Sequence, residues 1–126
     1  MEKLVIEATN HSPRAEFNPD GKLKLEGRSF PEDAAGFYSP LIQFAAELET
    51  MSVTFQINLE YINTASSKKL LELFRQLDFN ENIFNVTVDW HYEEGDDDSV
   101  ETAEIFEESL DRIKFVYSEY AEVNPA

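Results

Sequence analysis

The chain contains no cysteine and little glycine, proline or tryptophan, and these shortages exclude several classes of function. Its 126 residues include no Cys, four Gly, five Pro and one Trp. Without cysteine there are no disulfides, thiolate nucleophiles or cysteine-ligated metals, which fits a reducing compartment. No secretion signal is visible, and no apolar run approaches the roughly 18 residues of a membrane-spanning helix. We therefore expect a cytoplasmic protein without membrane insertion.

Basic residues are also scarce. The chain has 10 Lys and Arg against 26 Asp and Glu, a formal net charge of −16. Nucleic acids and anionic membranes are bound through basic surfaces, so we expect neither as a partner. The balance favours protein partners with basic patches. The length and a hydrophobic content of 42% predict one domain, residues 1–126, with a substantial core.

Sequence signatures of enzymes are missing as well. The chain has no P-loop, no GxGxxG and no GxSxG motif. Its two histidines, His11 and His91, are eighty positions apart and lack metal-ligand spacing. We predict no metal, no cofactor and no enzymatic activity. A small hydrolase or transferase that uses a polar sheet face and the acidic loop is the alternative from another class.

Alternating apolar residues predict the strands. The pattern is cleanest from Val53 to Tyr61 and recurs from Val86 to Tyr92. The turn sequence Asn18-Pro19-Asp20-Gly21 predicts a hairpin, because proline and glycine stand at suitable positions. The predicted strands cover residues 2–8, 14–17, 22–27, 53–61, 86–92 and 113–117.

Apolar spacings of three and four predict three helices between these strands. The first begins after Ser29 or Phe30, with Pro31 at its first position, and runs to about Glu49. Pro40 predicts a kink or two abutting segments near residues 38–39. The second helix buries Leu70, Leu73, Phe74 and Leu77, and the third, capped by Asp98 or Ser99, buries Ala103, Phe106 and Leu110. The tail after Tyr120 is expected to be loose.

The order is therefore β-hairpin, α, β, α, β, α, β. Strands joined by helices imply parallel pairing with right-handed crossovers. Because the strands alternate instead of being apolar throughout, the helices are expected on one face of a mixed sheet. The prediction is a two-layer α/β domain. Its other face is expected to be solvated, with a second interface as the alternative; that face carries Thr54, Gln56, Asn58, Asp89 and His91.

The junction from Leu59 to Lys68 is the most informative segment. A strand runs into a cluster of hydroxyl residues, and an amphipathic helix follows directly. Free N–H groups and the positive end of the dipole make a helix N-terminus a place where phosphate is tolerated. One of Asn63, Thr64, Ser66 and Ser67 is expected to cap the helix, and the surplus hydroxyls leave a regulated phosphorylation site as the alternative. Lys68 and Lys69 follow within one turn and would partly offset a phosphate.

A second notable segment, residues 93–111, is rich in Asp and Glu. It lacks the spacing, the central Gly and the terminal Glu of an EF-hand, so we interpret it as a solvated loop and a polar helix face. Docking onto a basic surface of a kinase or phosphatase is the alternative. Its acidic residues are Glu93, Glu94, Asp96, Asp97, Asp98, Glu101, Glu104, Glu107, Glu108 and Asp111.

Four segments together resemble the SiaC family of bacterial regulatory phosphoproteins. They are Gly27-Arg28-Ser29-Phe30-Pro31-Glu32-Asp33, Phe37-Tyr38-Ser39-Pro40-Leu41, the junction Leu59–Lys68 and Val86-Thr87-Val88-Asp89-Trp90-His91-Tyr92. They follow the family's order over nearly the whole chain, and Asn-Thr-x-Ser-x-Lys is the most specific part. The resemblance implies a STAS-like domain, similar to anti-sigma-factor antagonists.

The resemblance also implies a function. Thr64 would be phosphorylated by a Ser/Thr protein kinase and dephosphorylated by a PP2C-type phosphatase. The unphosphorylated form would bind and activate a diguanylate cyclase, which makes the protein part of cyclic-di-GMP signalling. Asn63, Ser66, Ser67 and Lys68 would form the partner-binding surface around the site. Ala65 stands where many relatives have Ser. A constitutive acidic adaptor, in which Thr64 only caps the helix, is the alternative.

Overall fold

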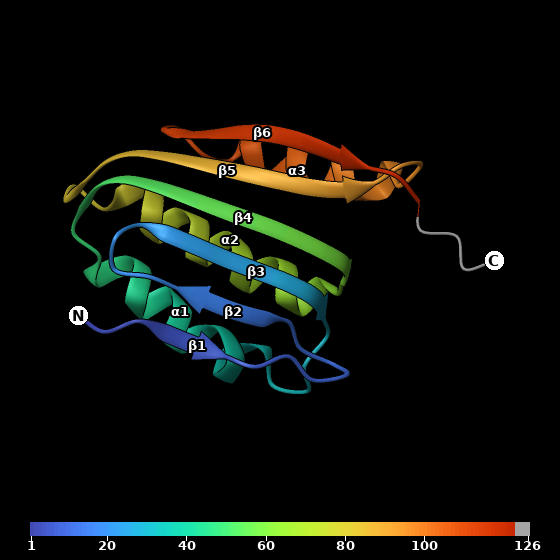
Figure 1. Cartoon of the computed structure of the whole chain (residues 1–126), viewed down its shortest axis with the longest axis horizontal. Helices are drawn as coiled ribbons and strands as arrows, with labels where there is room; N and C mark the ends of the chain where they lie inside the picture. Colours follow the sequence, from blue (N-terminus) through green and yellow to red (C-terminus); the bar gives the residue numbers. More distant parts are fainter. Residues whose placement is uncertain (123–126) are drawn as a thin grey trace.

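Six strands form one mixed sheet, and three helices cover one of its faces in the described part of the chain (Figure 1). The computed structural model describes residues 1–122. The elements are β1 (Leu4–Ile6), β2 (Arg14–Phe17), β3 (Lys22–Ser29), α1 (Ala34–Glu47), β4 (Thr50–Ile62), α2 (Thr64–Phe79), β5 (Ile83–Glu93), α3 (Asp97–Glu108) and β6 (Ile113–Tyr120).

The strands lie in the order in which they occur in the chain. β1, β2 and β3 pair antiparallel, whereas β3, β4, β5 and β6 pair parallel. Each parallel pair is joined by a helix, and Figure 1 shows all three helices behind the sheet. The predicted two-layer α/β fold, a mixed sheet with helices on one face, is therefore confirmed. No helix among residues 1–122 is long and apolar enough to cross a membrane.

The hairpin between β2 and β3 forms at the predicted turn. The Gly21 N–H donates to the Asn18 carbonyl at 3.0 Å, and Gly21 has a φ of +101°. A Cβ there would collide with the carbonyl oxygen of Ser52 on β4. Glycine is needed for both reasons, the left-handed conformation and the close approach of β4.

The core lies between the sheet and the helices, as the alternating pattern predicted. Trp90, Phe55 and Phe74 are fully buried or nearly so. Phe74 of α2 makes edge-to-face contacts with Phe55, Phe106 and Phe115, at centroid distances of 5.9, 5.2 and 5.6 Å. One aromatic side chain therefore joins α2 to β4, α3 and β6.

The predicted start of the first helix is wrong. Strand β3 continues to Ser29, and α1 begins only at Ala34, where the Asp33 carboxylate accepts the Gly36 N–H at 2.9 Å. Ser29 remains in the strand because its side chain is buried and hydrogen-bonded to the Tyr38 hydroxyl at 2.7 Å. The helix ends at Glu47, two residues before the prediction, and Pro40 lies inside one continuous helix, not between two segments.

The predicted cap of the third helix is also wrong. Asp96 caps α3 by accepting the Ser99 N–H at 3.1 Å, so neither Asp98 nor Ser99 has that role. The Ser99 hydroxyl instead accepts the indole N–H of Trp90 at 2.9 Å. Leu110 is buried as expected, but it lies beyond the helix, which ends at Glu108. Of the tail expected to be loose, residues 123–126 lie outside the described residues.

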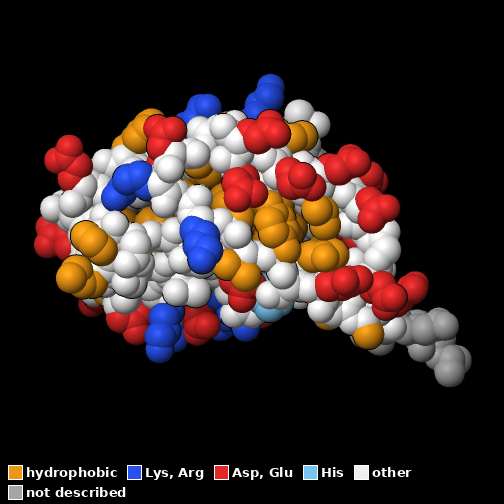
Figure 2. Space-filling view, turned by 90° about the horizontal axis from the view of Figure 1, so that it is seen from above, with side chains coloured by type: hydrophobic (Ala, Val, Ile, Leu, Met, Phe, Trp, Pro, Cys, Tyr) orange, Lys and Arg blue, Asp and Glu red, His pale blue; other side chains and the backbone are white. Residues whose placement is uncertain are grey.

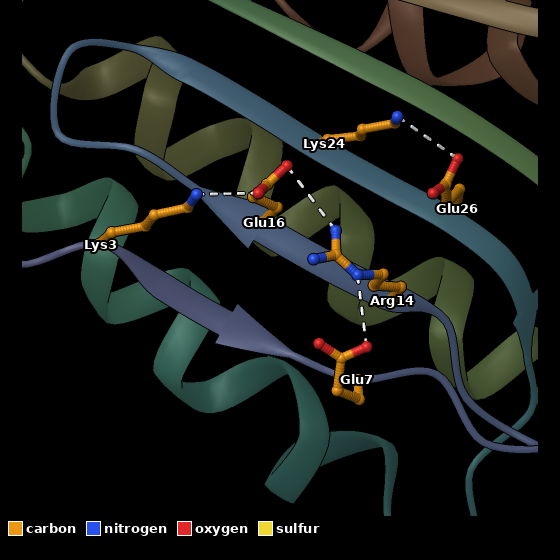
Figure 3. Close-up of polar contacts among 6 residues, drawn as sticks. All are labelled: Lys3, Glu7, Arg14, Glu16, Lys24 and Glu26. Atoms are coloured by element: carbon orange, nitrogen blue, oxygen red, sulfur yellow. Dashed lines mark hydrogen bonds and ion pairs between the residues drawn. The ribbon is translucent and has the colours of Figure 1, made fainter.

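Ion pairs cover the open face of the N-terminal strands (Figure 3). The pairs are Lys3–Glu16 at 2.9 Å, Arg14–Glu16 at 3.6 Å, Arg14–Glu7 at 3.4 Å and Lys24–Glu26 at 3.7 Å. The hydrogen bond from Lys3 lowers the pKa of Glu16, and the charges of Lys3 and Arg14 lower it further. Exposed pairs of this kind add little stability each. Their main effect is to keep this face polar, as predicted.

Candidate phosphorylation site

The junction between β4 and α2 is held by Asn63. Its side-chain oxygen accepts the Ser66 N–H at 2.8 Å, and its carbonyl accepts the Ser67 N–H at 2.9 Å. Its own N–H donates to the carbonyl of Ser29 on the neighbouring strand β3 at 3.0 Å. Asn63 is therefore the N-cap of α2, and Thr64 does not cap the helix.

Thr64 is the first residue of α2, and its side chain is exposed to solvent. The first helical hydrogen bond runs from Ser67 to Asn63, so the N–H groups of Thr64 and Ala65 precede it. These donors and the positive end of the dipole favour a negative group at this position. The site therefore combines an accessible hydroxyl with surroundings that tolerate a phosphate.

Basic side chains lie near the N-terminus of α2. Lys68 is exposed and forms no ion pair among residues 1–122, whereas Lys69 is paired with Glu72 at 3.3 Å. Arg28 lies opposite Tyr61 in the register of β3 and β4, and its side chain contacts Glu60 at 3.1 Å. No local sequence pattern indicates a role for Arg28, because only the pairing of β3 with β4 brings it to the junction.

Ser66 and Ser67 differ in accessibility. Ser67 is half-buried, but Ser66 is 0% exposed, so its side chain cannot contact a partner and that part of the prediction is revised. The Ser66 hydroxyl lies beside the Tyr38 phenol and has no hydrogen-bond partner among residues 1–122. Burial raises the pKa of Tyr38 to about 12, against the opposing effect of its hydrogen bond with Ser29. Ser66 thus belongs to a buried polar contact between the N-terminal parts of α1 and α2.

Aromatic side chains form a second feature next to the junction. The ring of Phe30 makes edge-to-face contacts with the rings of His11 and Tyr61, at centroid distances of 5.3 and 5.6 Å respectively. Tyr61 is 54% exposed although its place in the alternation predicted an inward position. A register shift at Gly27 and Arg28 interrupts the pairing at this end of β4. This exposed aromatic surface was not predicted from the sequence.

A groove of about 290 Å³ opens between the end of β4 and the start of α3. Tyr61 and Ile62 line one side of it, and Asp98, Ser99 and Thr102 line the other. The groove begins two residues before Thr64. A partner covering Thr64 therefore meets apolar and acidic groups in the same area.

The acidic segment forms no metal site in the described chain. Residues 1–122 contain no group of three or more His, Asp or Glu side chains arranged to hold a metal ion. Asp96 is a helix cap, and Asp97 and Asp98 lie in the first turn of α3, where they complement the helix dipole. His91 is paired with Asp89 at 3.0 Å on the open face of the sheet.

Known structures share this fold over nearly the whole chain. A chain of the crystal structure of the diguanylate cyclase SiaD in complex with its activator SiaC from Pseudomonas aeruginosa matches with a TM-score of 0.82 and 22% identity, covering 93% of this chain and 99% of that one. SiaC of Pseudomonas aeruginosa matches with a TM-score of 0.79 and 23% identity over 97% and 100% of the two chains. Apo-SiaC of the same organism matches with a TM-score of 0.77 and 26% identity, covering 94% of this chain and 99% of that one.

The family comparison agrees with these structures. A search of curated protein sequences gave no match. The family model described as SiaC family regulatory phosphoprotein matches residues 6–120, which include every strand and helix except the first two residues of β1. The chain belongs to the SiaC family of regulatory phosphoproteins.

Proposed function

We propose that this protein is a non-enzymatic, cytoplasmic switch that is controlled by reversible phosphorylation of Thr64. The observation that carries the proposal is the division of roles at the junction. Asn63 caps α2, which leaves the neighbouring Thr64 hydroxyl exposed and without a capping role. A Ser/Thr protein kinase adds the phosphate and a PP2C-type phosphatase removes it.

The charge of the phosphate drives the switch. Phosphorylation adds a charge of about −1.5 to −2 and three acceptor oxygens. The folded domain tolerates this group, because the helix N-terminus stabilises it while it remains in water. A partner that covers Thr64 must desolvate the phosphate, and this costs several kcal/mol unless the charge is paired, on the order of the penalty for other buried charges.

The output partner is a diguanylate cyclase. This assignment rests on the family and on the similar SiaC that is the activator of the cyclase SiaD in their complex. The unphosphorylated protein binds and activates the cyclase through Tyr61, Asn63, Ser67 and Lys68, which are exposed or half-buried residues near Thr64. Because Asn63 is anchored to both α2 and β3, we expect the phosphate to block binding directly, not by moving the helix.

The proposal is tested by phosphorylating the purified full-length chain with its cognate kinase and ATP. Mass spectrometry should show one added phosphate on the native protein and none on Thr64→Ala. Ser67→Ala is the matched control, since it removes a half-buried hydroxyl of the same helical turn. Modification of Thr64→Ala, or its loss in Ser67→Ala alone, would place the acceptor elsewhere.

Binding to the cyclase is measured separately by calorimetry with native and phosphorylated protein. We expect phosphorylation to weaken binding by at least about tenfold, which corresponds to about 1.4 kcal/mol. Equal affinity of the two forms would contradict the switch and would support the constitutive acidic adaptor. Turnover of a substrate by the purified chain alone would instead support the hydrolase or transferase alternative.

A further inference from the structure

The two edge strands of the sheet differ in how they are protected against pairing with a strand of another protein. β1 forms one edge and has three residues, flanked by Lys3 and Glu7, whose charges join the ion pairs of the open face. β6 forms the other edge and has eight residues, with no proline and no register shift against β5. Among residues 1–122 no strand pairs with the outer side of β6. Its outward backbone N–H and C=O groups are therefore available for another strand.

Exposed apolar side chains lie on both sides of this edge. Val116 of β6 is 40% exposed on the open side of the sheet, whereas Ile105, which is 64% exposed, belongs to α3 on the helix side. Figure 2 views the molecule from the side of β6 and α3, and it shows hydrophobic side chains gathered between acidic ones. An exposed apolar patch with a charged rim is typical of a protein-binding surface.

The acidic rim is connected to β6 by Tyr117. The Tyr117 hydroxyl donates to the Glu107 carboxylate of α3 at 2.8 Å. Burial raises the pKa of Tyr117, and the nearby carboxylates of Glu107 and Glu104 raise it further. Glu104 and Glu107 therefore lie on the helix side of the β6 edge, opposite to the face that carries Val116.

We propose that the β6 edge binds an extended segment of a partner protein as a seventh strand, in which apolar and basic side chains alternate. In a strand, successive side chains point to opposite faces. The apolar row of such a segment packs beside Val116, while its basic row faces Glu104 and Glu107. Main-chain hydrogen bonds to β6 supply the register, as in other cases of strand addition.

Charge favours this occupant over a second copy of the chain. Each protomer carries a net charge of −16. Antiparallel pairing of two β6 strands about a twofold axis would bring the acidic faces of two α3 helices side by side. A basic segment is attracted by the same charges. This surface is separate from Thr64, so the inference does not depend on the proposed function.

The test uses a defined probe and the full-length protein. The probe is a capped eight-residue peptide in which lysine alternates with valine. Its control is the same peptide with every backbone nitrogen methylated, which keeps the side chains and the charge but removes the donors. We expect hydrogen exchange of the β6 amides to slow in the presence of the first peptide only. Equal protection by the methylated peptide, or no protection of β6 at saturating peptide, would overturn the proposal.

Two matched variants locate the binding. Val116→Lys introduces a charge beside the apolar row, and Val5→Lys makes the same change on the opposite edge strand, where the valine is 41% exposed. Val116→Lys should weaken peptide binding by at least about tenfold, while Val5→Lys should leave it unchanged. Equal effects would overturn the assignment to β6. Light scattering of the protein without peptide must show a monomer, since a dimer that Val116→Lys dissociates would make a second copy the occupant.

Discussion

At the scale of single residues, Asn63 and Thr64 have different tasks although both are polar and adjacent. The Asn63 side chain accepts a backbone N–H of α2, and the Thr64 side chain points to solvent. Removal of an N-cap costs about 1 kcal/mol, whereas exposed substitutions usually change stability by less than about 0.5 kcal/mol.

Substitution of the two residues by alanine separates these tasks. We expect Asn63→Ala to lower the free energy of unfolding by about 1 kcal/mol, and Thr64→Ala to change it by less than about 0.5 kcal/mol. Urea denaturation followed by circular dichroism measures both. A larger loss for Thr64→Ala than for Asn63→Ala would mean that Thr64 has a structural role.

A second residue-scale prediction concerns Tyr38 at high pH. Its pKa is raised to about 12 in the folded protein, above the ordinary value of 10.0, because the phenol is buried. The unfolded phenol ionises first, so the contribution of Tyr38 to stability is complete below pH 10 and is lost as the pH rises toward 12. Between these values the native protein should lose about 2 kcal/mol more than Tyr38→Phe.

Denaturant titrations at several pH values on the native protein and Tyr38→Phe check this difference. The comparison is needed because the pKa values of Tyr117 and Tyr120 are also raised, mainly by burial, and both tyrosines remain in the variant. Parallel pH profiles of the two proteins would show that the Tyr38 phenol ionises in the folded state as easily as in the unfolded chain.

At the scale of elements, α1 and α2 lack a C-terminal glycine, and side chains from elsewhere in the chain donate hydrogen bonds to their last carbonyl groups. α1 and α2 are followed by Leu48 and Asn80. The Asn80 amide donates to the carbonyls of Ala45 and Leu48 at 2.9 and 2.8 Å. Arg112 caps the end of α2 from outside the helix; it donates to the carbonyls of Leu77, Asp78, Asn80 and Ile83 at 2.8 to 3.2 Å.

Arg112→Ala should therefore destabilise the fold more than an ordinary surface substitution. It leaves several carbonyls unpaired at the end of α2, and we expect a loss of about 2–3 kcal/mol in urea unfolding. Lys114→Ala, an exposed site two residues further along, is the control. Arg112→Lys should recover only part of the loss, because an ammonium group cannot reproduce the planar fork of the guanidinium. Full recovery would contradict this account of the cap.

At the scale of the whole molecule, the excess of acidic over basic side chains opposes folding. A net charge of −16 on 126 residues produces self-repulsion in the compact state. The ion pairs of Figure 3 relieve it around the N-terminal strands. The acidic residues of α3 are mostly exposed, and no ion pair to Lys or Arg involves them among residues 1–122.

Salt should consequently stabilise the protein. When the ionic strength rises from about 0.01 to 0.15 M, the Debye length falls from about 30 to about 8 Å, which screens long-range repulsion more than close contacts. We expect the thermal midpoint to increase with added sodium chloride. A decrease would show that attraction within the surface ion pairs outweighs the repulsion.

Much of this molecule followed from local patterns in the sequence. The alternation from Val53 to Leu59 and the turn at Asn18–Gly21 predicted β4 and the hairpin, because strand period and turn chemistry are local properties. The hydroxyl cluster also predicted where a helix would begin and that one of four residues would cap it. The resemblance to the family supplied Thr64 as the acceptor, which no periodicity indicates.

Tertiary structure decided what local patterns could not. Ser29 stays in β3 because Tyr38 and Asn63 bind it across distant parts of the chain. Ser66 is buried and Arg28 reaches the junction because of how neighbouring elements pack. Residue type and spacing determined the elements and their order, since these depend on near neighbours. Exposure of each hydroxyl, and the unprotected edge at β6, depend on which elements lie beside one another, and only the folded chain sets that.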